Sequence, residues 1–164
     1  MIDINLEIIR NILQEKGDRK KMKSDDKNVL REVQKNTQMA MQAIDSISSK
    51  IYDDTLAAQA TKDSLRYGEI YNRATNELLQ GKAESYKETG YQEMMLRGAI
   101  KANTMLNSST SHLAELLIQG TNRGLTDMWK IMNHCENAGD RSVEIAKELM
   151  DFEEKSIEKL KEFL

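Results

Sequence analysis

The sequence of 164 residues has no proline, one cysteine and few aromatic residues, which make up 5% of the chain. Sandwiches and barrels need many turns, which often use proline, so its absence argues against them. Long helices are favoured instead, because proline disrupts a helix interior. The single Cys135 cannot form an intramolecular disulfide, as is typical of a reducing compartment. The length predicts one main domain.

Charge and hydropathy argue against two kinds of partner. The chain carries 24 Lys and Arg against 27 Asp and Glu, for a net charge of −3. With both signs interspersed, no field draws it to nucleic acid or to an anionic membrane. No apolar run approaches the ~18 residues that span a bilayer, and no cationic stretch precedes an apolar one at the start. We therefore expect a cytoplasmic protein with neither nucleic acid nor membrane as a partner.

Apolar residues recur every three or four positions along four long stretches, at about 26–51, 56–79, 111–135 and 141–164. This spacing is typical of amphipathic helices that pack lengthwise. A shorter helix is expected within the less regular stretch 82–107. The pattern predicts an all-α four-helix bundle. In it, two antiparallel hairpins are joined by a long connection, which is a ferritin-like arrangement.

The first 26 residues are predicted to lie apart from the bundle of residues 27–164. Apolar residues between Ile2 and Leu13 indicate a short amphipathic helix, and the charged stretch that follows indicates a linker. Within the bundle, Asp53 is expected to cap the start of the second long helix. Gly81 is expected to end that helix as a C-cap glycine.

A dinuclear metal site is the enzyme-class hypothesis for such a bundle. It requires a Glu from each of two helices and a Glu-x-x-His from each of the other two. Neither His112 nor His134 has a Glu three residues earlier, and the inward faces of the first two long helices are expected to carry no carboxylate. The alternative that remains is an atypical site for iron, manganese or zinc, formed by His112, Glu115 and Glu153.

Two further features have structural interpretations. Glu153 lies on the inward stripe of the last helix, where we expect a partly buried ion pair with Arg123. Gly120 and Gly124 form a Gly-x-x-x-Gly spacing, which predicts close packing within the bundle or against a second copy. The chain has no phosphate-binding loop, nucleophile elbow or Cys-x-x-Cys, so no catalytic or cofactor-binding residue is predicted.

Residues 108–124 read SSTSHLAELLIQGTNRG, and the tail runs from Phe152 through Leu164. Both segments resemble an uncharacterised family of small ferritin-like helical-bundle proteins from anaerobic Gram-positive bacteria, over about residues 27–164. The chain departs from the family pattern at Arg123, where the family has a methionine. The resemblance implies a ferritin-like bundle without an established activity. It also slightly favours His112 and Glu115 as candidate metal ligands.

These observations predict a non-enzymatic helical bundle that acts through protein contacts, as a homo-oligomer or with a helical partner. Apolar helical surface is abundant, whereas groups suited to catalysis are scarce. The segment Ile2–Leu13 can dock on a neighbouring copy, since a short helix gains most of its stability from such packing. The alternative function is that of a ferritin-like metal-binding protein.

Overall fold

Helices make up most of the structure, in keeping with the lack of proline. The computed structural model describes residues 21–164, apart from the side chains of Tyr91 and Leu106. Its elements are α2 (Ser24–Ser48), α3 (Asp54–Gln80), α4 (Gly90–Leu106), α5 (Thr110–His134), α6 (Asp140–Leu160) and the short 3₁₀ helix η1 (Lys161–Phe163). The all-α prediction is confirmed for these residues. The predicted helix Ile2–Leu13 lies outside them.

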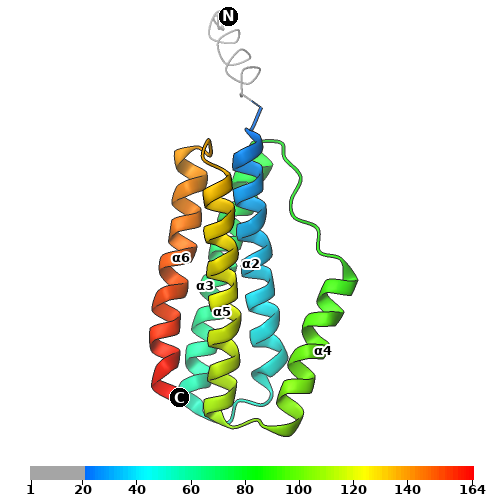
Figure 1. Ribbon diagram of the computed structural model, residues 1–164, viewed down its shortest axis with the longest axis vertical. Coiled ribbons are helices and arrows are strands. Elements are labelled where there is room, and N and C mark those ends of the chain that lie inside the picture. The colour runs from blue at the N-terminus through cyan, green and yellow to red at the C-terminus, as the bar shows by residue number, and fades with distance from the viewer. Residues whose placement is uncertain (1–20) are drawn as a thin grey trace, which may run out of the picture.

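Four helices lie side by side, and α4 stands off to one side of them (Figure 1). α2 packs against α3 and α5 packs against α6, which are the two pairs predicted from the sequence. α2 also contacts α5, and α3 contacts α6. α4 belongs to the long connection between α3 and α5. Its contacts with the long helices are chiefly with α2.

Each of these four long helices contributes apolar side chains to the core. Leu30 of α2, Ile70 of α3, Met128 of α5 and Leu149 of α6 have almost no exposed surface. Complete burial of such a side chain stabilises the fold by about 1.5–3 kcal/mol. Among residues 21–164, no helix combines the length and the apolar content needed to cross a membrane.

The start of α2, Ser24, lies two residues before the predicted start at about residue 26. Residues 24–26, assigned to the linker, form the first turn of this helix. Asp25 Oδ2 accepts a hydrogen bond from the backbone N–H of Asn137 at 3.0 Å, and Asp26 Oδ1 accepts one from that of Gly139 at 2.7 Å. The end of the charged run therefore holds the turn between α5 and α6.

The two ends of α3 are capped in different ways. At the start, Asp53 accepts a hydrogen bond from the backbone N–H of Leu56 at 2.8 Å, which confirms the predicted cap. At the other end, Gly81 is the C-cap residue as predicted, but its φ is −77°. The left-handed conformation falls on Lys82, with a φ of 52°. The backbone N–H of Ala83 then donates to the carbonyl of Leu78, as in a Schellman motif.

We expect Lys82→Gly to raise the free energy of unfolding by about 0.5–1 kcal/mol, because glycine adopts a left-handed conformation without the strain of a Cβ atom. Urea denaturation followed by circular dichroism measures the change. Lys87→Gly is the control, since Lys87 lies in the same connection without a positive φ. A stability that is unchanged or lowered in Lys82→Gly would contradict the prediction.

Three glutamines of α2 hold the connection between α3 and α4 in place. Gln34 Oε1 accepts from the backbone N–H of Tyr86 at 2.8 Å. Gln38 Nε2 and Gln42 Nε2 donate to Glu88 Oε2 at 2.8 and 2.7 Å. These glutamines are spaced by four residues and share one face of α2. The connection ends at a capping box, from which α4 extends for 17 residues, longer than the short helix predicted there.

Candidate functional site

The three residues of the predicted metal site fall in two different places. His112 and Glu115 meet near the start of α5, with 3.5 Å between Nδ1 and Oε2. Glu153 lies on α6, where it is fully buried beside Tyr67 of α3. Within residues 21–164, no three His, Cys, Asp or Glu side chains are placed to share one metal ion. The structure thus brings His112 and Glu115 together without Glu153.

The partner of Glu153 is a tyrosine, not the arginine expected from the sequence. Tyr67 Oη donates to Glu153 Oε1 at 3.4 Å, and the two residues lie on facing helices. Asn36 of α2 also approaches this carboxyl group. Arg123 is exposed on α5. It forms no ion pair with any residue in the described part of the chain.

Burial controls the charge of Glu153. It raises the pKa of this carboxyl group from 4.5 to about 8, although the nearby Tyr67 hydroxyl and Asn36 amide groups act in the opposite direction. Glu153 is therefore mostly protonated at neutral pH. A carboxyl group must lose its proton to ligate a metal, so burial opposes the role predicted for Glu153. Two atoms in the cluster, Asn36 Nδ2 and Glu153 Oε2, make no hydrogen bond with a described residue.

Asp63 is a second inward carboxyl group, on a face of α3 expected to have none. Its side chain is 5% exposed. Ser156 Oγ donates to Asp63 Oδ2 at 2.6 Å, and Gln59 Nε2 donates to Oδ1 at 2.7 Å. Burial raises the pKa of Asp63, and these two hydrogen bonds partly offset the effect. The expectation for this face of α3 was therefore wrong.

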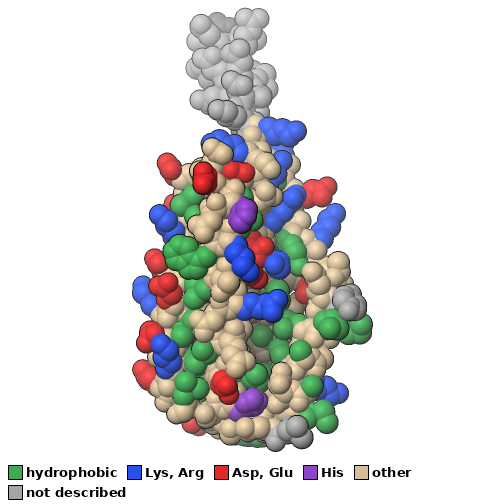
Figure 2. All heavy atoms as spheres, in the orientation of Figure 1, with side chains coloured by type: hydrophobic (Ala, Val, Ile, Leu, Met, Phe, Trp, Pro, Cys, Tyr) green, Lys and Arg blue, Asp and Glu red, His purple; other side chains and the backbone are tan. Residues whose placement is uncertain are grey.

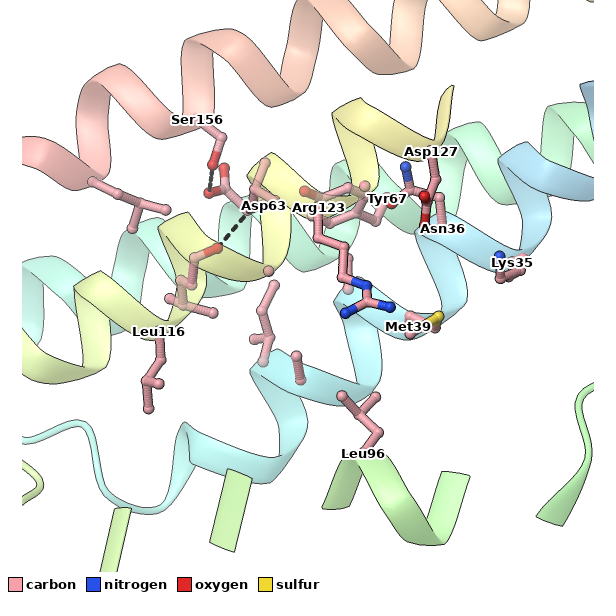
Figure 3. Close-up of a pocket in the computed structure, with 18 of the residues that line it drawn as sticks. Lys35, Asn36, Met39, Asp63, Tyr67, Leu96, Leu116, Arg123, Asp127 and Ser156 are labelled. Atoms are coloured by element: carbon pink, nitrogen blue, oxygen red, sulfur yellow. Dashed lines mark hydrogen bonds between the residues drawn. The ribbon is translucent and has the colours of Figure 1, made fainter. Parts of the chain in front are cut away.

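A cavity of about 140 Å³ opens between α2 and α5, next to these polar groups (Figure 3). Its walls are mainly apolar, and Asp63, Tyr67 and Ser156 lie at its inner end. The space exists because small residues, among them Ala40 and Gly120, line the facing helices. A Cβ atom added to Gly120 would meet no other atom within 4 Å. The cavity is therefore open on the α5 side.

The outer face of α4 is a second feature that the sequence did not predict. Met94, Met95 and Met105 are 65%, 56% and 73% exposed. Figure 2 shows hydrophobic side chains on the surface over this helix. Leu96 and Ile100, which lie on the other side of α4, line the cavity and pack on the core, respectively. α4 thus has two apolar faces. The face toward the bundle is packed against it, and the outer face is exposed.

The site residues divide into those the sequence indicated and those it did not. Glu153 was placed inward from its spacing and is buried, as is Tyr67 beside it. Asp63 and Asn36 were missed, although Asp63 continues the inward register of α3. The structure offers a buried polar cluster around Glu153, an apolar cavity and an exposed helix face. Comparisons of the chain with protein-family models, with curated proteins and with solved structures found no match.

Proposed function

We propose that the protein is a non-enzymatic, cytoplasmic helical bundle that acts by self-association through the outer face of α4. The observation that carries the proposal is the pattern of four exposed residues on this face: Met95, Gly98, Ala102 and Met105. At 3.6 residues per turn they fall within an arc of about 80°. A Cβ atom added to Gly98 would meet nothing within 4 Å, so the centre of the face is open.

The spacing of these residues is self-complementary. Their intervals are three, four and three, so the pattern reads the same in both directions. An antiparallel copy of α4 can therefore place Met95 beside the partner's Met105, with the small residues Gly98 and Ala102 at the crossing point. A two-fold dimer requires such a self-complementary patch. This symmetry favours a second copy over an unrelated helical partner.

The arrangement of the long helices supports a ferritin-like bundle as part of the proposal. The pairs α2–α3 and α5–α6 are joined by a long connection, and contacts link α2 to α5 and α3 to α6. This is the order expected of two hairpins with one crossover. It agrees with the resemblance of residues 27–164 to small ferritin-like bundle proteins. In such a chain, the crossover helix α4 is free to carry the contact surface.

Sedimentation velocity over a range of concentrations tests the proposal. Burial of a methionine side chain favours association by about 1.5–3 kcal/mol. The loss of translational and rotational freedom opposes association. We therefore expect a dimer, twice the 18.8 kDa of the chain, to form in the micromolar range. Met95→Lys or Met105→Glu alone should give monomers, because each variant buries an unpaired charge. The double variant should dimerise again, since residue 95 of one copy faces residue 105 of the other.

The control is Leu65→Glu, which places a charge on an exposed apolar position of α3 and should leave the dimer intact. A wild-type chain that stays monomeric at every concentration overturns the proposal. A double variant that stays monomeric while the control dimerises overturns the antiparallel geometry. If Ile8→Glu dissociates the dimer and the α4 variants do not, then the segment Ile2–Leu13 forms the interface and α4 does not.

A further inference from the structure

The cavity between α2 and α5 has the form of a site for a hydrocarbon chain. Ala43 and Ile44 of α2, Leu116 and Leu117 of α5, and Leu160 of α6 line it. The two acceptor oxygens of Asp63 at its inner end already receive hydrogen bonds from Ser156 and Gln59. The inner end therefore does not require a polar ligand to satisfy that carboxyl group.

The size of the cavity limits the length of the chain that fits. An apolar cavity of about 150 Å³ engineered in another protein stays dry and binds benzene, a ligand of six carbons. The cavity here, at about 140 Å³, has a similar volume. A chain of about six carbons fills it, and any further atoms of the ligand must lie at the mouth.

The mouth of the cavity carries one cation without an ion pair in the described chain. Lys35 is paired with Glu32 at 3.0 Å, and Asp127 is paired with Lys130 at 3.3 Å. Arg123 lines the same mouth, and Figure 3 shows it reaching from α5 toward Met39 of α2. Its guanidinium group can accommodate both oxygens of a carboxylate.

A buried donor on the cavity lining also lacks a partner. Asn36 is 7% exposed and belongs to the lining. Its Nδ2 atom makes no hydrogen bond with any residue among 21–164. Asn36 and Arg123 lie on the two helices that form the walls, α2 and α5.

We propose that this cavity binds a free medium-chain carboxylate, with its hydrocarbon chain between α2 and α5 and its carboxylate at Arg123. Two features point to this occupant: the apolar walls have room for about six carbons, and the arginine at the mouth has no ion pair among residues 21–164. The inference is independent of self-association, because the outer face of α4 takes no part in it.

Isothermal titration of the full chain with octanoate, and separately with octanol, tests the proposal. Both ligands are expected to bind. Arg123→Gln should weaken octanoate binding about fivefold, the effect of one solvent-exposed ion pair, and should leave octanol binding unchanged. Lys147→Gln removes the same charge from an exposed position of α6 outside the lining, and should change neither affinity. Gly120→Leu fills the mouth and should abolish binding of both ligands.

Each other result overturns the proposal. If neither ligand binds the wild-type chain, the cavity is not a hydrocarbon site. If Gly120→Leu folds and still binds octanoate, the ligand lies elsewhere. If Arg123→Gln weakens octanoate and octanol equally, or neither, Arg123 does not pair with the carboxylate. This last comparison uses only a surface substitution, so it decides the matter even if Gly120→Leu fails to fold.

Discussion

Near pH 9, Glu153→Gln is expected to raise the free energy of unfolding by about 4 kcal/mol, and near pH 5 by less than about 1 kcal/mol. The reason is the burial of Glu153, which raises the pKa of its carboxyl group to about 8. Gln has the shape of the protonated carboxyl group and can still accept the hydrogen bond from Tyr67. It therefore retains the packing and removes the titration.

The direction of the change in stability with pH follows from the pKa of Glu153 in the folded and unfolded states. In the unfolded chain the carboxyl group ionises near 4.5, and in the folded chain it ionises near 8. Between these values the folded state binds more protons than the unfolded state, so stability falls as the pH rises. The slope approaches about 1.4 kcal/mol per pH unit and ends above the folded pKa. The stabilising effect of the neutral carboxyl group is thus fully present only below about pH 4.5.

Chemical denaturation at a series of pH values measures the effect. The matched control is Glu154→Gln, which makes the same change of charge at the next, exposed position of α6. Wild type and Glu154→Gln should lose stability together as the pH rises from about 5 to about 9, whereas Glu153→Gln should lose much less. Parallel pH profiles for all three proteins would show that Glu153 is ionised in the folded state.

Much of the architecture could be predicted because hydrophobic spacing determines which face of a helix is buried. The helix predicted at 111–135 is observed at Thr110–His134. The polar interactions that shape the connections leave no such pattern. The glutamines at 34, 38 and 42 hold the α3–α4 connection through hydrogen bonds. Glutamines at the same four-residue spacing also occur on solvent-exposed helix faces, so the spacing alone does not reveal these contacts. The left-handed residue beside Gly81 was missed because lysine rarely adopts that conformation.

The candidate site was predicted less completely, in part because charged residues were left out of the helix register. Asp63 continues the buried series from Ala60 to Tyr67 and Ile70, at intervals of three, four and three. Its spacing was a usable signal. The pairing of Glu153 with Arg123 was wrong for a geometric reason. Arg123 follows the buried Thr121 by two residues, which places it about 200° around the helix.

The two glycines of the Gly-x-x-x-Gly spacing lead to opposite predictions. A Cβ atom at Gly124 would lie 2.5 Å from Asn36 Oδ1, whereas one at Gly120 would meet nothing within 4 Å. Gly120→Ala should therefore raise the free energy of unfolding by about 1 kcal/mol, the difference in helix propensity. Gly124→Ala should lower it by about 1–2 kcal/mol, because overpacking outweighs that gain and displaces Asn36 from Glu153.

A double-mutant cycle on urea denaturation identifies the cause. Asn36→Ala removes the side chain that the new methyl group would meet. Gly124→Ala should then stabilise the Asn36→Ala background, where only the gain in helix propensity is left. If Gly124→Ala destabilises both backgrounds equally, the contact with Asn36 is not the cause, and the closeness of α5 to α2 at Gly124 does not depend on this side chain. With the predicted signs, Gly124 fixes the spacing of α2 and α5 at Asn36, and Gly120, one turn earlier, leaves the cavity between them open.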